Sequence, residues 1–262
     1  MRFHFLICIL LAVPSSLQGA VLNTDPRFNN WPRLSTTDTV TRIPVYIETG
    51  RYTGAEVRNI REGISLINAD LNGCVNFFEF TTPGTPPGDF LWITANLNNG
   101  TRPFICMAIG AHAVAQNRLG QKLILVSGAP GGCVGNTREV VKFLANTLGL
   151  LNEFQRLDRP ITVIPANVDI SLQGFNIYSP FQSTLTNVIA SPFDYYSVTL
   201  YAPAKFQSTT GTGLPVYTNP VDAPTNQNFF IPRLSRLDCL ALVARYQCNA
   251  AVTTCPDPYA TG

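Results

Sequence analysis

The chain has 262 residues, 45% of them hydrophobic and 13% charged, which is enough apolar chain to bury one full core. Its 18 basic and 16 acidic residues leave a formal net charge of +2 without a basic stripe, so we expect no nucleic-acid partner. The two histidines are His4 and His112. A site that needs two or three imidazoles is excluded, since His4 lies in a segment that we expect to be removed.

Residues 1–20 are typical of a secretory signal peptide. Arg2 supplies one positive charge, and a mostly apolar run follows it at residues 3–13. Small and polar residues then continue to Ala20. This run is shorter than the roughly 20 residues of a membrane-spanning helix, and no later segment reaches that length. We therefore expect a secreted, extracellular protein with no membrane partner; a membrane anchor is the less favoured alternative.

The first half of the mature chain predicts a mixture of strands and helix. Residues 43–48 alternate as a short strand, and Pro44 favours an edge position because proline cannot complete a ladder. Residues 55–71 carry apolar side chains at helical spacing and predict an amphipathic helix. Further strands are predicted at residues 74–80, 90–94 and 123–126, with a turn at 83–88.

The second half begins with another helix and then changes in composition. An amphipathic helix is predicted over residues 137–151, with a cap at residues 136–137 and Gly149 near its end. Residues 160–232 are rich in Pro, Ser, Thr, Asn and aromatic residues, which indicates a loop-rich second lobe. A last helix is predicted at residues 235–246.

Cysteine usage indicates an oxidising compartment. Removal of the signal peptide leaves an even number of cysteines, for which three disulfides are the default reading, but spacing alone cannot choose the pairing. A zinc-thiolate cluster is disfavoured because the chain has no CxxC pair. Asn99 begins an Asn-Gly-Thr sequon and is a candidate glycosylation site. The remaining cysteines are Cys74, Cys106, Cys133, Cys239, Cys248 and Cys255.

Several ordered motifs match one known family. Residues 148–159 read Leu-Gly-Leu-Leu-Asn-Glu-Phe-Gln-Arg-Leu-Asp-Arg, and residues 194–201 read Asp-Tyr-Tyr-Ser-Val-Thr-Leu-Tyr. Residues 43–47 and 73–77 read Ile-Pro-Val-Tyr-Ile and Gly-Cys-Val-Asn-Phe. The closing helix carries Ser235, Asp238, Tyr246 and Cys248. Through these motifs most of the mature chain resembles the astacin metalloendopeptidases, which are metzincins.

The resemblance implies a fold. We expect an α+β, zincin-like domain of two lobes over residues 21–248, followed by a short tail at 249–262. The N-terminal lobe would hold a twisted sheet with two long helices, and the C-terminal lobe would be irregular with a final helix. The resemblance also implies the disulfides Cys74–Cys248 and Cys106–Cys133, which leaves Cys239 to pair with Cys255.

The zinc motif of the family is degenerate in this chain. Metzincins use H-E-x-x-H-x-x-G-x-x-H, in which three histidines bind zinc and the glutamate takes a proton from the bound water. Alignment on Gly149 places the ligand positions at Lys142, Asn146 and Asn152 and the general base at Phe143. An ammonium repels a dication, amide oxygens bind zinc poorly and a phenyl ring accepts no proton. We therefore expect no cofactor, although active relatives use zinc.

The resemblance assigns three more positions. Thr199 replaces the buried methionine of the family, and Tyr201 remains where a tyrosine contacts zinc or the oxyanion. The domain is expected to begin directly after the signal peptide, without room for a propeptide. Signal cleavage would then free an amine at about Val21, and we predict that this amine docks toward Glu153, as the processed amino terminus does in the family.

Other chemistries were weighed from the residues themselves. His112 lies outside the helix and is favoured as a surface or packed histidine over a metal ligand. A nucleophilic pair of Ser197 and Lys142 has no supporting motif, and a buried lysine that is hydrogen-bonded to the asparagines is favoured over it. Structural ion pairs are the simplest role for the neighbouring charged residues, which are Glu153, Arg156, Asp158 and Arg159.

These observations predict a catalytically inactive pseudoprotease. We expect it to be a monomer that binds an extracellular protein or peptide by adding it to an edge strand near residues 104–108. One rival is a residual metalloendopeptidase, which stoichiometric metal and chelator-sensitive cleavage would favour. Another rival is a structural or interaction component of an extracellular matrix or fluid, which would be favoured if changes in the cleft left partner binding intact.

Overall fold

The computed structural model describes residues 21–23, 28–81, 89–97, 100–108, 112–113, 120–128, 131–181, 186–188, 192–208, 213–224, 229–249 and 251–259. The expected signal peptide, the turn predicted at 83–88 and the sequon residue Asn99 lie outside these residues.

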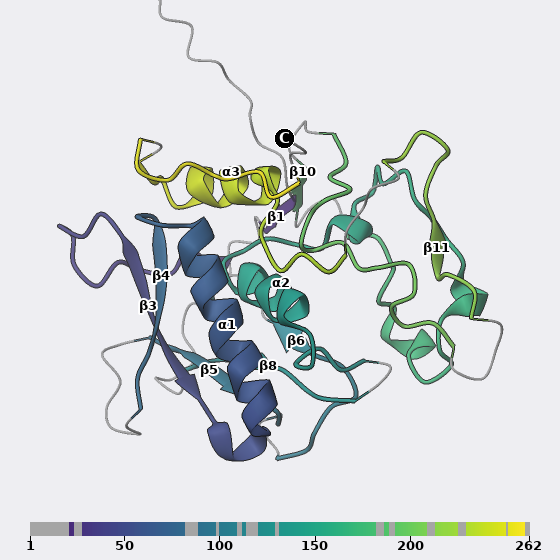
Figure 1. The fold of residues 1–262 in the computed structure, drawn as a ribbon, viewed down its shortest axis with the longest axis horizontal. Helices are drawn as coiled ribbons and strands as arrows, with labels where there is room; N and C mark the ends of the chain where they lie inside the picture. Colours follow the sequence, from purple (N-terminus) through teal and green to yellow (C-terminus); the bar gives the residue numbers. More distant parts are fainter. Residues whose placement is uncertain are drawn as a thin grey trace, which may run out of the picture.

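A five-stranded sheet and two long helices form the N-terminal lobe. The strands are β3 (Thr41–Ile47), β4 (Val75–Glu79), β5 (Leu91–Thr94), β6 (Met107–Ala108) and β8 (Gln121–Ile124), and the helices are α1 (Gly54–Asp70) and α2 (Thr137–Thr147). The strand order is β4-β3-β5-β8-β6, with β6 antiparallel at one edge and the other pairs parallel. Helices α1 and α2 pack against each other and against this sheet (Figure 1).

Local sequence explains how both helices begin and meet. A capping box in which Thr53 and Glu56 exchange hydrogen bonds starts α1. Gly63 allows α2 to come close, because a Cβ atom there would lie 2.7 Å from Val140 Cγ1. The second helix ends at Thr147 and not at residue 151 as predicted, because Gly149 adopts φ +104° and turns the chain out of the helix.

The prediction that the strand containing Pro44 lies at a sheet edge is wrong. Strand β3 lies between β4 and β5. Thr41 donates its amide toward β4, and the carbonyl of Val45 accepts from Phe80 on that same side. Because alternate residues face opposite neighbours, Pro44 faces the side of β5, and β5 is paired only from Val45 onward. The missing N–H of Pro44 therefore costs the sheet no hydrogen bond.

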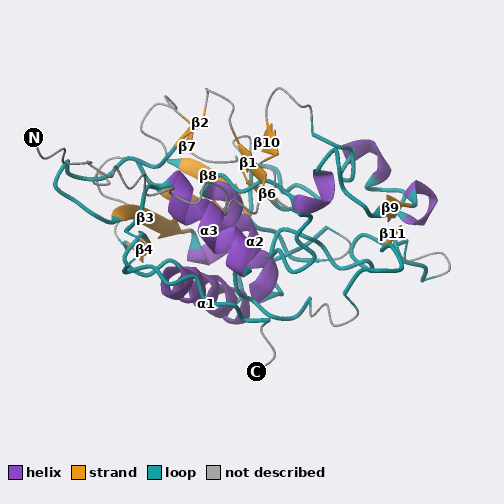
Figure 2. Cartoon of the chain, turned by 90° about the horizontal axis from the view of Figure 1, so that it is seen from above, coloured by secondary structure: helices purple, strands orange, loops and turns teal. Residues whose placement is uncertain are grey.

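The C-terminal lobe is largely irregular, as predicted. It contains the 3₁₀ turns Glu153–Gln155, Pro165–Asn167 and Gln173–Phe175 and the pair β9 (Thr162–Val163) and β11 (Tyr217–Thr218). The last helix, α3 (Arg236–Arg245), buries its apolar side chains in the same core as α1 and α2. Two further antiparallel pairs join distant segments, namely β1 (Val21–Asn23) with β10 (Thr186–Val188) and β2 (Phe28–Asn29) with β7 (His112–Ala113). Figure 2 shows this contrast, with the long helices gathered on one side and mostly loops on the other.

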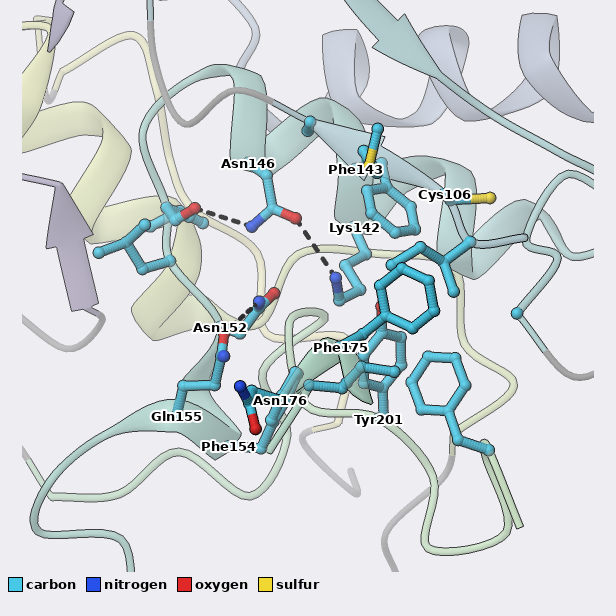
Figure 3. Close-up of a pocket in the computed structure, with 18 of the residues that line it drawn as sticks. Cys106, Lys142, Phe143, Asn146, Asn152, Phe154, Gln155, Phe175, Asn176 and Tyr201 are labelled. Carbon is cyan, nitrogen blue, oxygen red and sulfur yellow. Dashed lines mark hydrogen bonds between the residues drawn. The ribbon is translucent and has the colours of Figure 1, made fainter. Parts of the chain in front are cut away.

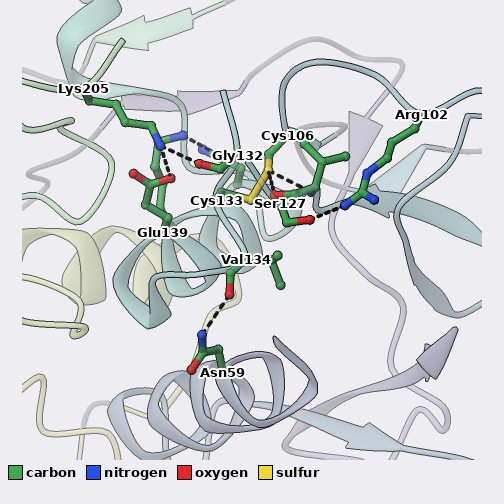
Figure 4. Close-up of a disulfide and its surroundings, with 12 residues drawn as sticks. Asn59, Arg102, Cys106, Ser127, Gly132, Cys133, Val134, Glu139 and Lys205 are labelled. Carbon is green, nitrogen blue, oxygen red and sulfur yellow. Dashed lines mark hydrogen bonds and ion pairs between the residues drawn. A yellow bond between two sulfur atoms is a disulfide. The ribbon is translucent and has the colours of Figure 1, made fainter. Parts of the chain in front are cut away.

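Three disulfides hold the domain together: Cys74–Cys248, Cys106–Cys133 and Cys239–Cys255. These are the pairs that the astacin resemblance implied. The Cys106–Cys133 bridge lies near the start of α2, close to the ion pair of Lys205 with Glu139 (Figure 4). No helix in the described part of the chain is long and apolar enough to span a membrane.

Candidate functional site

A pocket of about 380 Å³, which we call the central pocket, lies where α2, β6 and the C-terminal lobe meet. The three positions that the motif assigns to zinc ligands, Lys142, Asn146 and Asn152, all line it. Phe143 and Tyr201 line it as well. The amides of Asn146 and Asn152 lie on one side of Lys142 and the two aromatic rings on the other (Figure 3). The fold thus brings together the residues that sequence alignment placed at one site.

Gly149 directs the chain back toward this pocket after α2. Its φ is +104°, and a Cβ atom there would lie 2.6 Å from Nε of Arg245. The positive φ favours glycine, while the guanidinium of Arg245 is the flexible end of a side chain and could shift. The indole of Trp31 donates to the carbonyl of Thr147 at 2.8 Å and fixes the N-terminal segment against the end of the helix.

Lys142 supplies the charge in the central pocket and is 1% exposed. Its Nζ atom lies 4.1 Å from the ring centroid of Phe143 and 4.3 Å from that of Tyr201, which are cation–π distances. Burial lowers the pKa of Lys142 to about 7, and the negative charge of Glu139 only partly offsets this shift. The amine therefore titrates near neutral pH.

Asn146 is held as an acceptor for this amine. Its Nδ2 atom donates to the carbonyl of Leu150 at 2.8 Å, so its Oδ1 atom faces Lys142. Nζ of Lys142 donates to that oxygen at 3.3 Å. The expected buried lysine is thus hydrogen-bonded to one asparagine, Asn146, and not to Asn152 as well.

Asn152 is oriented by a chain of two hydrogen bonds through Gln155, which we call the Gln155 relay. Its Nδ2 atom donates to Oε1 of Gln155 at 2.6 Å. Gln155 in turn donates Nε2 to the carbonyl of Ser179 at 3.2 Å, so its oxygen is the end that faces Asn152. This leaves Oδ1 of Asn152 buried without a hydrogen bond from the described residues.

This set of donors does not fit zinc. Lys142 offers an ammonium or, after deprotonation, one amine, while the oxygen of Asn146 is already engaged by it. Zinc in proteins is held by thiolates, imidazoles and carboxylates. Among the described residues, no group of three or more His, Cys, Asp or Glu side chains could hold a metal ion. The ring of Phe143 cannot serve as a general base, so no hydrolytic step follows from these residues.

The charged residues that follow Asn152 form a network in which Glu153 and Arg156 are buried and Asp158 is exposed. Glu153 Oε1 pairs with Arg156 at 2.8 Å, and both side chains are at most 1% exposed. Arg156 also makes two hydrogen bonds to Asp158, each of 2.8 Å. Burial raises the pKa of Glu153 to about 8, although the Arg156 charge opposes the shift. Arg159 forms no ion pair with a described residue and donates instead to two backbone carbonyls.

The structure does not bring Ser197 and Lys142 together as a nucleophilic pair. Ser197 is fully buried and donates Oγ to Asp238 at 2.8 Å. Its Oγ atom also lies 2.8 Å from Oγ1 of Thr199. That Oγ1 atom accepts a hydrogen bond from the backbone N–H of Glu153 at 3.0 Å. Thr199, at the position of the family's methionine, therefore links this turn to Glu153.

Strand β1 lies beside the loop that follows α2. The carbonyl of Val21 accepts from the amide of Leu151 at 2.7 Å. Oε2 of Glu153, two residues further on, receives no hydrogen bond from the described residues. Docking of a Val21 amine onto Glu153 stays a prediction. The side chain of His112 lies outside the described part of the structure.

The sequence did not single out Gln155 or the aromatic walls of the central pocket. Gln155 lies three residues after Asn152, and this spacing was the available signal. The walls come from segments without regular periodicity, so no pattern marked them. They include Phe154, Phe175, Phe181 and Phe206.

Comparison with solved structures identifies the fold. High choriolytic enzyme 1, a hatching-enzyme zinc protease from the medaka fish Oryzias latipes, matches with a TM-score of 0.61 and 21% identity, over 84% of this chain and 95% of that one. Myroilysin matches with a TM-score of 0.50 and 14% identity, over 87% and 99%. No family model and no curated protein sequence matches the chain. The predicted astacin-like, metzincin fold is thereby confirmed: this chain has the fold of a hatching-enzyme zinc protease.

Proposed function

We propose that the chain is a secreted pseudoprotease, which holds an extended segment of an extracellular protein or peptide in the central pocket without hydrolysing it. One observation carries this proposal. The buried amine of Lys142 lies at the first ligand position of the motif, between two aromatic rings and bonded to the residue at the second position. An amine in that place competes with a dication for the same space and for the same oxygen.

The edge of the sheet supports the peptide-binding part of the proposal. Strand β6 lies at one edge, and both Met107 and Ala108 line the central pocket. No strand among the described residues pairs with its outer side. An extended peptide can add to such an edge through main-chain hydrogen bonds and place its side chains in the adjacent pocket. Three disulfides are consistent with export to an oxidising compartment.

Elemental analysis together with a cleavage assay tests the inactive part of the proposal. We expect purified secreted protein to contain no stoichiometric zinc at neutral pH and to leave a broad peptide mixture uncut. A matched positive control restores the motif with Lys142→His, Phe143→Glu, Asn146→His and Asn152→His. Because the three ligand positions, 142, 146 and 152, line one pocket, the restored variant should gain one zinc per chain.

Two outcomes would contradict the proposal. Stoichiometric zinc in the unaltered protein, with peptide cleavage that a chelator abolishes, would establish the residual protease instead. Partner binding that survives a bulky substitution at the rim of the central pocket, such as Ala108→Trp, would favour an interaction surface elsewhere on the molecule.

A further inference from the structure

The ammonium of Lys142 has more hydrogen-bond donors than the described residues satisfy. An ammonium carries three N–H bonds, and within the described residues Lys142 makes one hydrogen bond, which at 3.3 Å is long. The acid whose charge acts on it, Glu139, is already paired with Lys205 at 2.8 Å. Lys142 is 1% exposed and lines the central pocket, so an acceptor can reach its remaining donors only from inside that pocket.

The charge of the pocket selects a singly charged anion. Lys142 is the one basic residue among the described residues that line it, and no aspartate or glutamate is among them. A carboxylate would therefore meet one positive charge and no opposing negative charge. A doubly charged phosphate would lack the second cation that its charge requires.

A second polar group, Oδ1 of Asn152, and the aromatic walls define the rest of the ligand. Oδ1 of Asn152 is a buried acceptor without a donor from the described residues, and the Gln155 relay prevents the amide from turning over. A ligand N–H would satisfy it. The aromatic walls, which include Phe154 and Phe175, favour an apolar or aromatic side chain on the same ligand.

We propose that the central pocket binds the free carboxylate of a peptide that ends in an apolar or aromatic residue. The carboxylate lies on Lys142, the amide N–H of the last residue donates to Asn152, and the last side chain lies against the aromatic walls. This inference rests on the proposed function, because it names the part of a peptide that the pocket takes. A small aromatic acid offers the same carboxylate and ring without the N–H, and the experiment separates the two sources.

The test compares three probes by NMR titration of the purified protein at pH 6. The probes are acetyl-Ala-Ala-Phe with a free carboxylate, the same peptide as a C-terminal amide, and 3-phenylpropanoate. We expect the free acid to bind at least about tenfold tighter than the amide, since hydrogen bonds to charged groups are the strong ones. This comparison needs no variant, so it is independent of any effect of mutation on folding.

Variants assign the contacts. Lys142→Met should bring the affinity for the acid down to that for the amide. Lys122→Met, which removes the same charge from β8 outside the pocket, should leave the acid tighter than the amide. Asn152→Ala should weaken binding of the peptide acid by about tenfold and affect 3-phenylpropanoate much less, because that probe has no N–H.

The outcomes distinguish this inference from the proposed function. Equal affinity for acid and amide would overturn the carboxylate inference and leave peptide binding in place. Binding of 3-phenylpropanoate as tightly as the peptide, with no effect of Asn152→Ala, would overturn the assignment to a peptide terminus. Failure of both peptides to bind in the pocket at millimolar concentration would overturn peptide binding there and this inference with it.

Discussion

Two buried cations, Lys142 and Arg156, lie close in sequence but have opposite surroundings. Arg156 donates to Glu153, to Asp158 through two bonds and to the carbonyl of Pro192. Lys142 makes one hydrogen bond to a neutral amide within the described residues. Burial alone would lower the pKa of Arg156, but hydrogen bonds to Asp158 and Glu153 hold it above its ordinary value, whereas the pKa of Lys142 falls to about 7.

This difference in hydrogen-bond partners separates a charge that holds the fold together from one that can bind a ligand. A buried charge whose donors are all used stabilises one arrangement of its neighbours and has nothing left for a ligand. A buried charge with unused donors destabilises the empty protein, and that cost falls when a matching anion binds. On this reasoning Arg156 belongs to the framework of the C-terminal lobe, and Lys142 belongs to the binding site.

The largest expected effect comes from removing the satisfied cation. Arg156→Met leaves the buried carboxyl of Glu153 without its partner, and breaking a buried pair in this way costs about 3 to 5 kcal/mol. Urea unfolding at pH 9, above the pKa of about 8 that burial gives Glu153, measures the loss. Arg159→Met is the matched control, because Arg159 donates only to backbone carbonyls, and it should cost about 1 kcal/mol. A loss for Arg156→Met no larger than for the control would remove the distinction between the two cations.

Lys142→Met should have the opposite sign. Methionine fills a similar volume without a charge, so it should raise the free energy of unfolding by about 1 to 3 kcal/mol at pH 6. Lys122→Met, on the partly exposed face of β8, should change it by less than about 0.5 kcal/mol. Destabilisation by Lys142→Met of more than about 1 kcal/mol would mean that the amine is better satisfied than its one hydrogen bond indicates.

The sequence predicted which residues lie in the central pocket better than it predicted their hydrogen-bond partners. The resemblance to the metzincin motif, aligned on Gly149, placed Lys142, Asn146 and Asn152 at one site, and the motif carries over because a helix and a glycine turn are local structures. The partner of Asn152 was missed because its orientation depends on the carbonyl of Ser179, which only the tertiary fold brings near.

The fold shows the same division between local and tertiary information. Apolar spacing predicted α1, α2 and α3 to within a few residues, apart from the end of α2. The interior place of β3 could not be read from Pro44, because it depends on where pairing with β5 begins along the strand. The disulfide pairs came from the family resemblance, since cysteine spacing alone allows many pairings.

The smallest expected effect is a pH dependence at the partner of the satisfied cation. Burial raises the pKa of Glu153 from 4.5 to about 8, so between these values the folded protein holds a proton that the unfolded chain releases. Stability from this group is therefore full below about pH 4.5 and is lost as the pH rises through 8. Asp194, whose burial raises its pKa to about 7, acts in the same direction, and Lys142 acts in the opposite direction above pH 7.

A variant isolates the contribution of Glu153, because Asp194 and Lys142 titrate in both proteins. Glu153→Gln mimics the protonated acid, so the excess of its unfolding free energy over that of the unaltered protein should grow by about 1 kcal/mol between pH 5 and pH 6. Urea unfolding at the two pH values measures the difference. If it is the same at both, the native carboxylate is already ionised at pH 5. A Val21 amine docked on the open oxygen of Glu153 would produce that result, and N-terminal sequencing of the secreted protein would then have to find Val21 as its first residue.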